Sequence, residues 1–301
     1  MFEYHYLAFN SEKENELLQF VEKHPWKPHW SNEHIKEFIQ LLISSGDLIF
    51  DLYSNNNRIA IAVLIDKIQN KGNNACLEVL ALDQSYDATK IYHYFIESTI
   101  QKLPETRSGI EITIHESLIE VINLLKQKNF VAYYDIFEMQ AEMAPIYSNV
   151  KEIVTLLPEG FAECYEVTKI CFKDNPEMAI PNYKEWEMAK KALDSQSWVY
   201  MSNNNIVGFV NSVADVQHKR FEIRSIGVLP NYRGKGIGRK LLQHSLSFFT
   251  KKGISSCNLT VASQNRSALR LYEEIGFHVN DTFNVYCWNR RASTGKHGSR
   301  S

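Results

Sequence analysis

The chain has 301 residues, of which 44% are hydrophobic and 23% are charged, and its formal net charge is −2. These values are typical of a soluble globular protein with one or two domains, and they disfavour binding to nucleic acid or an anionic membrane. We find no apolar run near the roughly 20 residues that cross a bilayer, and no signal peptide. Five scattered cysteines without a CxxC pair argue against disulfides and zinc, so we expect a cytoplasmic protein without a metal.

The sequence indicates an internal duplication. The tetrapeptide SNNN occurs at residues 54–57 and again at 202–205, each time between two apolar runs. Asparagine tolerates the positive φ of tight turns, so each copy predicts a β-hairpin. A shift of 147 residues also superposes 78–100 on 225–247, and it continues without a gap until Phe130 meets Phe277. The pattern predicts two copies of one fold. The alternative is two generic α/β segments whose apolar pattern and spacing are similar by chance.

The boundary between the copies is expected near residue 144. The stretch 139–150 contains Pro145 and has no clear hydrophobic period. We therefore predict one domain over 1–144 and another over 145–290. Residues 291–301 are small, basic and polar, which is typical of a disordered tail.

The second copy has a clear order of predicted elements. They are helices over 160–173 and 182–193, a hairpin over 198–215, a strand over 221–228, a helix over 235–251, a strand over 256–261, a helix over 265–275 and final strands over 277–288. The helix that joins strands 221–228 and 256–261 makes these strands parallel, while the others look antiparallel. The predicted class is α+β, with a mixed and mostly antiparallel sheet flanked by helices.

A glycine-rich turn connects the strand 221–228 to its helix. Gly234, Gly236 and Gly238 follow Arg233 and alternate with Lys235 and Ile237. A helix N-terminus has unpaired N–H groups, and glycine lets an anion approach them, so the pattern favours a phosphate site. The alternative is a tight turn without a ligand. The GxGxG spacing, with no acidic residue about 20 positions later, disfavours NAD.

Two motifs then point to a family. The stretch VLPNYRGKGIGRKLL resembles the acyl-CoA-binding motif of the GNAT acetyltransferases, Arg/Gln-x-x-Gly-x-Gly/Ala, at Arg233, Gly236 and Gly238. The stretch NRSALRLYEEIGF resembles the downstream motif of that family, met by Asn265, Ala268, Leu271, Tyr272, Gly276 and Phe277. The resemblance covers residues 151–290. It implies the acyl-CoA N-acyltransferase fold, with a V-shaped opening between strands 221–228 and 256–261, and two tandem GNAT-like domains in the whole chain.

The resemblance also implies roles for single residues. The backbone of Ile226, Gly227 and Val228 would bind the pantetheine arm, and an amide near Val228 would stabilise the oxyanion. Asn265 and Ala268 would contact the CoA arm, and Tyr272 would protonate the leaving thiolate. The pyrophosphate would be held by a continuous segment, formed by Arg233, Gly234, Lys235, Gly236, Ile237, Gly238 and Arg239.

An acceptor amine must also lose a proton before it attacks. Glu222 is the predicted base, because it lies on the strand of the oxyanion site, where several family members carry a catalytic glutamate. Strand alternation predicts that Glu222 shares a face with Arg224 and Ile226. The alternatives are a surface glutamate paired with Arg224, with a water chain as the base, or the weaker candidate His218. We do not expect an acyl intermediate on Cys257.

The first copy departs from the CoA motif. In the shift of 147, Arg233 falls on Tyr86, Gly234 on Asp87, Gly236 on Thr89 and Gly238 on Ile91. We therefore predict a degenerate GNAT-like domain that does not bind CoA. The aromatic-rich segment 24–34 either lines the acceptor site or anchors packing.

The predicted function is an acetyl-CoA-dependent N-acetyltransferase. The acetyl group would pass directly to a primary amine of a small molecule or peptide. The alternative is a non-catalytic module that senses CoA or acyl-CoA. We expect a monomer or homodimer with no nucleic acid, membrane or metal partner, while the acceptor and the acyl length stay open.

Overall fold

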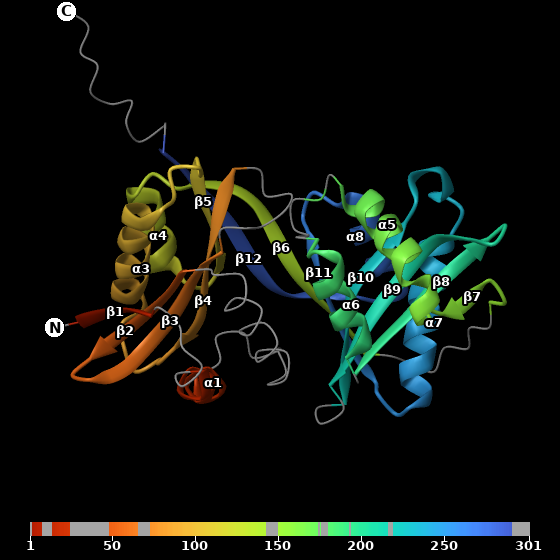
Figure 1. The fold of residues 1–301 in the computed structure, drawn as a ribbon, viewed down its shortest axis with the longest axis horizontal. Coiled ribbons are helices and arrows are strands. Elements are labelled where there is room, and N and C mark those ends of the chain that lie inside the picture. The colour runs from red at the N-terminus through yellow and green to blue at the C-terminus, as the bar shows by residue number, and fades with distance from the viewer. Residues whose placement is uncertain are drawn as a thin grey trace, which may run out of the picture. The chain divides into compact units, whose positions relative to one another are not determined.

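The computed structural model describes residues 2–7, 14–24, 48–65, 73–142, 150–173, 175, 180–192, 194–215 and 219–290. The chain divides into two compact units (Figure 1). Unit 1 comprises Met1–Tyr134 and Phe283–Ser301, and unit 2 comprises Asp135–Thr282.

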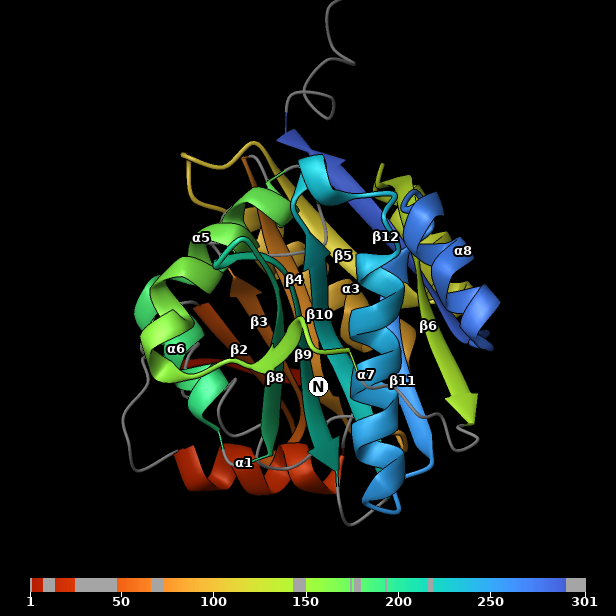
Figure 2. The ribbon, with the colours of Figure 1, turned by 90° about the vertical axis from the view of Figure 1, so that its right-hand side faces the viewer.

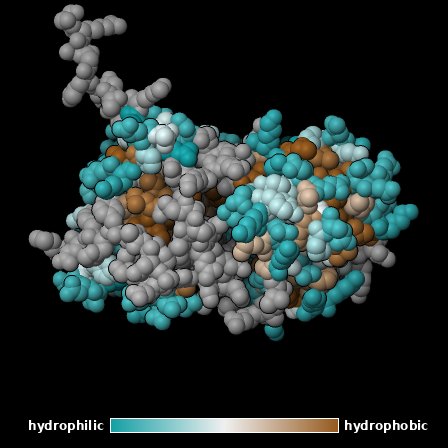
Figure 3. All heavy atoms as spheres, in the orientation of Figure 1, coloured by the Kyte–Doolittle hydropathy of each residue, from teal (hydrophilic) through white to brown (hydrophobic). Residues whose placement is uncertain are grey.

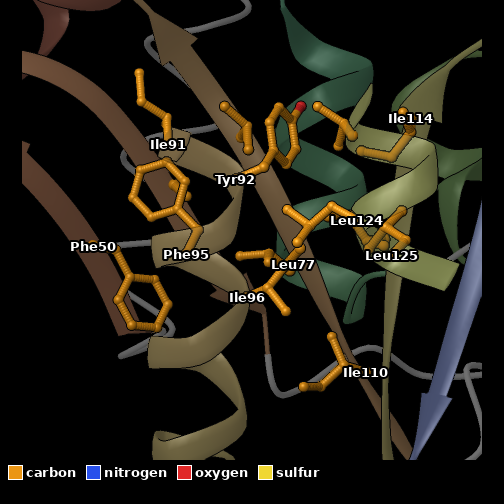
Figure 4. Packing of buried hydrophobic residues seen from close by; sticks show 14 of the residues in the cluster. Phe50, Leu77, Ile91, Tyr92, Phe95, Ile96, Ile110, Ile114, Leu124 and Leu125 are labelled. Atoms are coloured by element: carbon orange, nitrogen blue, oxygen red, sulfur yellow. The ribbon is translucent and has the colours of Figure 1, made fainter. Parts of the chain in front are cut away.

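Unit 1 is a mixed sheet with helices on its faces. Its strands follow the order β1 (Phe2–Leu7), β2 (Leu48–Ser54), β3 (Asn57–Ile65), β4 (Asn74–Leu82), β5 (Gly109–His115) and β12 (His278–Asn289). Only β4 and β5 are parallel among these neighbours. The helices are α1 (Glu14–Lys23), α3 (Ala88–Lys102) and α4 (Ile119–Gln127). Figure 4 shows Phe95 of α3 beside Phe50 of β2, with ring centroids 6.4 Å apart, so α3 closes the main core of this unit.

Unit 2 repeats this architecture. Its strands follow the order β6 (Val131–Glu142), β11 (Ser256–Ala262), β10 (Arg220–Val228), β9 (Asn205–Asp215), β8 (Ser195–Ser202) and β7 (Ile153–Thr155), and only β10 and β11 are parallel neighbours. Its helices are α5 (Phe161–Phe172), α6 (Tyr183–Lys191), α7 (Ile237–Lys251) and α8 (Arg266–Ile275), with the short 3₁₀ helices η1 (Pro158–Gly160) and η2 (Pro230–Tyr232). The predicted mixed sheet flanked by helices is confirmed in both units.

Two hydrophobic clusters cover the two faces of the sheet in unit 2. Figure 2 shows β8, β9 and β10 between α5 and α6 on one side and α7 and α8 on the other. Phe221 and Ile223 belong to the cluster with α7 and α8, whereas Phe209 belongs to the cluster with α5 and α6. A side chain of β10 therefore faces either α7 or α5, according to its position in the strand.

The predicted asparagine turns are confirmed. Asn55 and Asn56 have φ values of 50° and 64°, and Asn203 and Asn204 have values of 51° and 63°. Both pairs lie in the left-handed region that such two-residue turns require, so the repeated SNNN marks two equivalent hairpins.

The boundary between the two units differs from the predicted boundary near residue 144. Residues 136–142 of β6 pair with β11 in unit 2, and residues 283–289 of β12 pair with β5 in unit 1. Each copy of the repeat therefore gives its last strand to the sheet of the other unit. The boundary thus falls inside two long strands, where the sequence carries no turn signal, and not near residue 144.

The predicted gapless register of the repeat is wrong at one turn. Residues 83–87 join β4 to α3, whereas the longer segment 229–236 joins β10 to α7. As a result Asp87 and Gly236 occupy equivalent N-cap positions, and Gly236 does not correspond to Thr89. The shift of 147 holds again from β5 and β11, which begin at Gly109 and Ser256.

Three sequence predictions lie outside the described residues: residues 25–34 of the aromatic-rich segment, His218 and the tail 291–301. Figure 3 shows that hydrophilic residues form much of the visible described surface. Among the described helices, none is long and apolar enough to cross a membrane.

Candidate functional site

The turn before α7 needs glycine for its backbone conformation. Gly234 and Gly236 have φ values of +74° and +75°, in the left-handed region that other residues rarely adopt. A Cβ added to either glycine would meet no atom within 4 Å. The glycines are therefore required by the path of the chain, and that path leaves the space beside the start of α7 open.

The N-terminus of α7 has no side-chain cap. Its N-cap is Gly236, and no side chain accepts a hydrogen bond from the first-turn N–H groups. These groups lack partners within the helix and carry its positive partial charge. An incoming phosphate can therefore accept hydrogen bonds here without displacing a residue of the protein.

The equivalent helix of unit 1 has the opposite arrangement. The N-cap of α3 is Asp87, and its Oδ1 accepts from the amides of Thr89 at 2.9 Å and Lys90 at 3.3 Å. A carboxylate of the chain thus occupies the place where an anion would bind. That the first copy does not bind CoA stays a prediction, for which this cap offers a physical reason.

Basic side chains surround the turn before α7. Arg233 donates from Nε to the carbonyl of Val228 at 3.0 Å, and from Nη2 to that of Cys171 at 3.5 Å. The Nζ of Lys235 lies 4.9 Å from the ring centroid of Tyr232. Arg239 forms an ion pair with Glu274 of α8, and Gly238 and the buried Ile237 lie in the first turn of α7. Residues 233–239, the segment predicted to hold the pyrophosphate, therefore form the start of α7 and bring three basic side chains to it.

The strands β10 and β11 separate next to this turn. They pair at four positions, from Arg220 with Ser256 to Ile223 with Leu259. Both strands then continue, to Val228 and Ala262, without another paired position among the described residues. Ile226, Gly227 and Val228 pair with β9 alone in the described ladders, so their edge towards β11 remains available to a ligand backbone. This is the V-shaped opening that the resemblance implied.

A β-bulge corrects the predicted face of Glu222. The register with β9 passes from Ile223 directly to Ser225, so Arg224 is an extra residue. Beyond the bulge the alternation is reversed. Ile226 packs against the cluster under α7, as Ile223 does, whereas Glu222 lies on the opposite face. The prediction that Glu222 and Ile226 share a face is therefore wrong.

Arg224 nevertheless reaches Glu222. Its Nε lies 3.1 Å from Oε2 of Glu222, although that N–H is not aligned for a hydrogen bond. Burial lowers the pKa of Arg224 to about 10. The ion pair that we considered as an alternative is thus present, and a function of Glu222 as a base has to operate beside this guanidinium.

Glu222 has a proton affinity suited to neutral pH. Burial and, to a smaller extent, the nearby Glu138 raise the pKa of Glu222 to about 7, against the opposing effect of Arg220. A carboxyl with a pKa near the working pH is ionised often enough to accept a proton and basic enough to hold it. Glu138, on β6, was missed by the sequence analysis, because nothing in the sequence places that strand beside β11.

The second predicted motif forms α8 and its ends. Oδ1 of Asn265 accepts from the amide of Ala268 at 3.2 Å and caps the helix. Tyr272 is 5% exposed, and its ring centroid lies 5.9 Å from that of Phe277. Gly276 ends the helix with φ +109°. The motif residues thus define a capped helix whose buried face carries Tyr272.

Cys257 is unsuited to nucleophilic catalysis. It lies on the face of β11 towards α7 and α8, and its exposure is 0%. Burial raises the pKa of its thiol well above the ordinary value, so the reactive thiolate is disfavoured. This supports the expectation that no acyl intermediate forms on this residue.

The comparisons with known proteins agree with this geometry. Residues 161–277 match the model described as the acetyltransferase (GNAT) family. This part of the chain belongs to the GNAT family. The match begins at α5 and ends directly after α8, so it contains the glycine turn, the separated strands and the capped α8.

Curated relatives of the GNAT domain match it over part of their length. The chain is 33% identical over 85 residues to a streptothricin acetyltransferase from Streptomyces lavendulae, which covers 28% of this chain and 45% of that protein. It is 34% identical over 98 residues to a mycothiol acetyltransferase from Propionibacterium freudenreichii, and this match covers 32% of this chain and 31% of that protein. It is 39% identical over 54 residues to a ribosomal protein bS18 alanine N-acetyltransferase from Escherichia coli, covering 18% and 36%. The chain thus spans less than half the length of each.

Solved structures share the fold of the whole chain. A GCN5-related N-acetyltransferase from Sphaerobacter thermophilus superposes with a TM-score of 0.69 at 17% identity and covers 95% of both chains. A tandem GNAT protein from the clavulanic acid biosynthesis pathway gives 0.70 at 12% identity and covers 96% of this chain and 98% of that one. The predicted tandem GNAT fold is confirmed. Among the described residues, no group of three or more His, Cys, Asp and Glu side chains is placed to hold a metal ion.

The raised pKa of Glu222 predicts a stability effect in the GNAT domain. The folded chain holds this proton more tightly than an unfolded chain, whose carboxyl has a pKa near 4.5. The free energy of unfolding therefore falls as pH rises through about 7. Glu222→Gln cannot ionise, so it should gain on the order of 2–3 kcal/mol relative to wild type between about pH 5 and about pH 8.

Urea unfolding at several pH values measures this effect. The exposed Glu273→Gln on α8 is the matched control and should follow wild type throughout. An equal pH dependence in wild type and Glu222→Gln would show that Glu222 is ionised without a cost in the folded protein.

Proposed function

We propose that the chain is an acetyl-CoA-dependent N-acetyltransferase that transfers an acetyl group to a primary amine. The observation that carries the proposal is the uncapped start of α7, reached across two left-handed glycines, beside two strands that separate. A diphosphate fits the helix start, and an extended amide-bearing arm fits the free edge of β10. Acyl-CoA combines both groups in one substrate.

The chain's own residues would bind this donor as follows. The first-turn amides of α7, with Arg233 and Lys235 beside them, would hold the pyrophosphate. The pantetheine would take the place of the missing strand partner along the backbone of Ile226 and Val228. An amide near Val228 would donate to the thioester oxygen as negative charge develops there.

Proton transfer is assigned to two side chains. Glu222 would take a proton from the acceptor ammonium, the amine would then attack the thioester carbonyl, and the newly bonded nitrogen would lose its second proton to solvent. As the carbon–sulfur bond breaks, the hydroxyl of Tyr272 would protonate the leaving thiolate. Tyr272 would regain a proton from solvent, and Glu222 would release one, so both groups return to their starting states.

Relatives support an amine acceptor without fixing its identity. The curated relatives carry names that refer to streptothricin, to mycothiol and to an alanine of a ribosomal protein. These names span small molecules and a protein. We therefore propose a small-molecule or peptide amine as the acceptor.

Unit 1 is proposed to be a degenerate copy that does not bind CoA. The carboxylate of Asp87 accepts hydrogen bonds from the first amides of α3, and it would repel a diphosphate. One chain would thus bind one CoA.

Thiol release tests the proposed reaction. Wild type with acetyl-CoA should release thiol in the presence of one or more amines of a panel that includes small amines and peptides. Tyr272→Phe should keep CoA binding but lose about 10²-fold or more in kcat, since it lacks the proton for the leaving group. If CoA binds and no amine releases thiol, the chain is a CoA-binding module and the enzyme proposal fails.

Calorimetry on two variants of one glycine tests the donor site. Gly236→Asp would place at α7 the carboxylate that α3 carries, and it should weaken CoA binding about tenfold or more through charge repulsion. Gly236→Asn is the matched control, since asparagine has the same shape without the charge and tolerates positive φ. Equal affinities of the two variants would argue against a phosphate at this position.

A further inference from the structure

The face of unit 2 that carries Glu222 also carries a second buried carboxylate. In the parallel ladder Glu222 is paired with Asn258, and in the antiparallel ladder Asn258 is paired with Gln140 of β6. Glu138 is paired with Thr260, two residues along, and so projects from the same face. It is only 6% exposed.

Asn258 lies on the strand between the two carboxylates. Its Nδ2 donates to Oε1 of Glu138 at 3.3 Å. Its Oδ1 is buried and accepts no hydrogen bond within the described residues. Asn258, on the strand between the two acids, therefore fixes the position of Glu138, and its buried Oδ1 is left as an acceptor on the same face.

We propose that Glu138 is a positioning residue for the reaction, and that with Asn258 it places a second acidic group on the face of Glu222 and orients the acceptor ammonium towards Glu222. This inference rests on the proposed function, because it assigns Glu138 a part in the proton transfer to Glu222. Two carboxylates on one face cannot both ionise freely, so the charge of Glu138 favours the protonated form of Glu222. The same pair attracts a cationic acceptor.

Other charged or titratable groups lie near Glu222 among the described residues. On its own strand these are Arg220, which is bonded to Asp215 of β9 at 2.9 Å, and Arg224, at 3.1 Å from Glu222. On β11 the titratable neighbour is the neutral Cys257. β6 contributes Glu138, which raises the pKa of Glu222, whereas Arg220 lowers it.

Glu138 belongs to a strand that the first copy contributes to the sheet of unit 2. β6 belongs to the first copy in the sequence, yet its residues 136–142 pair with β11 in unit 2. The first half of the chain would thus supply a residue to the site of the second half.

Carboxyl-carbon NMR titration of glutamate-labelled protein tests the inference without relying on activity. Wild type, Glu138→Gln and Glu142→Gln are titrated, and Glu222→Gln assigns the signal. In Glu138→Gln the Glu222 midpoint should fall by about half a unit to one unit, because a like charge is removed while the acceptor for Asn258 is kept. Glu142 lies on β6 at the same register distance on the other side of Gln140, but it is exposed, so Glu142→Gln should leave the midpoint unchanged.

The pH dependence of kcat/KM provides the second arm. The acidic limb of the Glu138→Gln profile should move to lower pH by the same amount as the NMR midpoint, and the Glu142→Gln profile should match wild type. An unmoved NMR midpoint in Glu138→Gln, or an equal movement in Glu142→Gln, overturns the inference. If the Glu222 midpoint moves in Glu138→Gln but the kcat/KM profile does not, Glu222 is not the base, and that part of the proposed function is wrong.

Discussion

The start of a helix carries N–H groups that need a partner, and this constraint separates the two halves of the chain. In α3 the partner is the carboxylate of Asp87. In α7 the N-cap is a glycine that offers no side chain, and the turn before it is longer. Two otherwise similar folds thus differ at one helix end, and in our proposal that difference decides where an anionic substrate is held.

The strands around this helix end complete the site. β10 gives up its pairing with β11 after four residues and gains a bulge at Arg224. The separation leaves backbone groups of β10 without a partner on β11, and the bulge turns Ile226 towards the cluster under α7, on the face opposite to Glu222. Glu222, the proposed base, and Ile226, whose backbone is proposed to bind the donor, therefore belong to one strand although their side chains lie on different faces of it.

Local sequence predicted much of this arrangement because local chemistry fixes it. The asparagine turns, the glycine turn and the cap at Asn265 follow from the conformations that these residues allow. The bulge at Arg224, the extra length of the turn before Gly236 and the pairing of β6 with β11 depend on contacts between segments far apart in the chain. These are the features that the sequence analysis missed, and Glu138 was missed with them.

Hydrogen exchange at the two helix starts, with and without CoA, tests the central claim most directly. The account predicts that CoA slows exchange of backbone amides in residues 233–240 and leaves residues 86–92 unchanged, because Asp87 already holds the equivalent amides. Protection of 86–92 to the same degree, or no protection of 233–240 at saturating CoA, would contradict it.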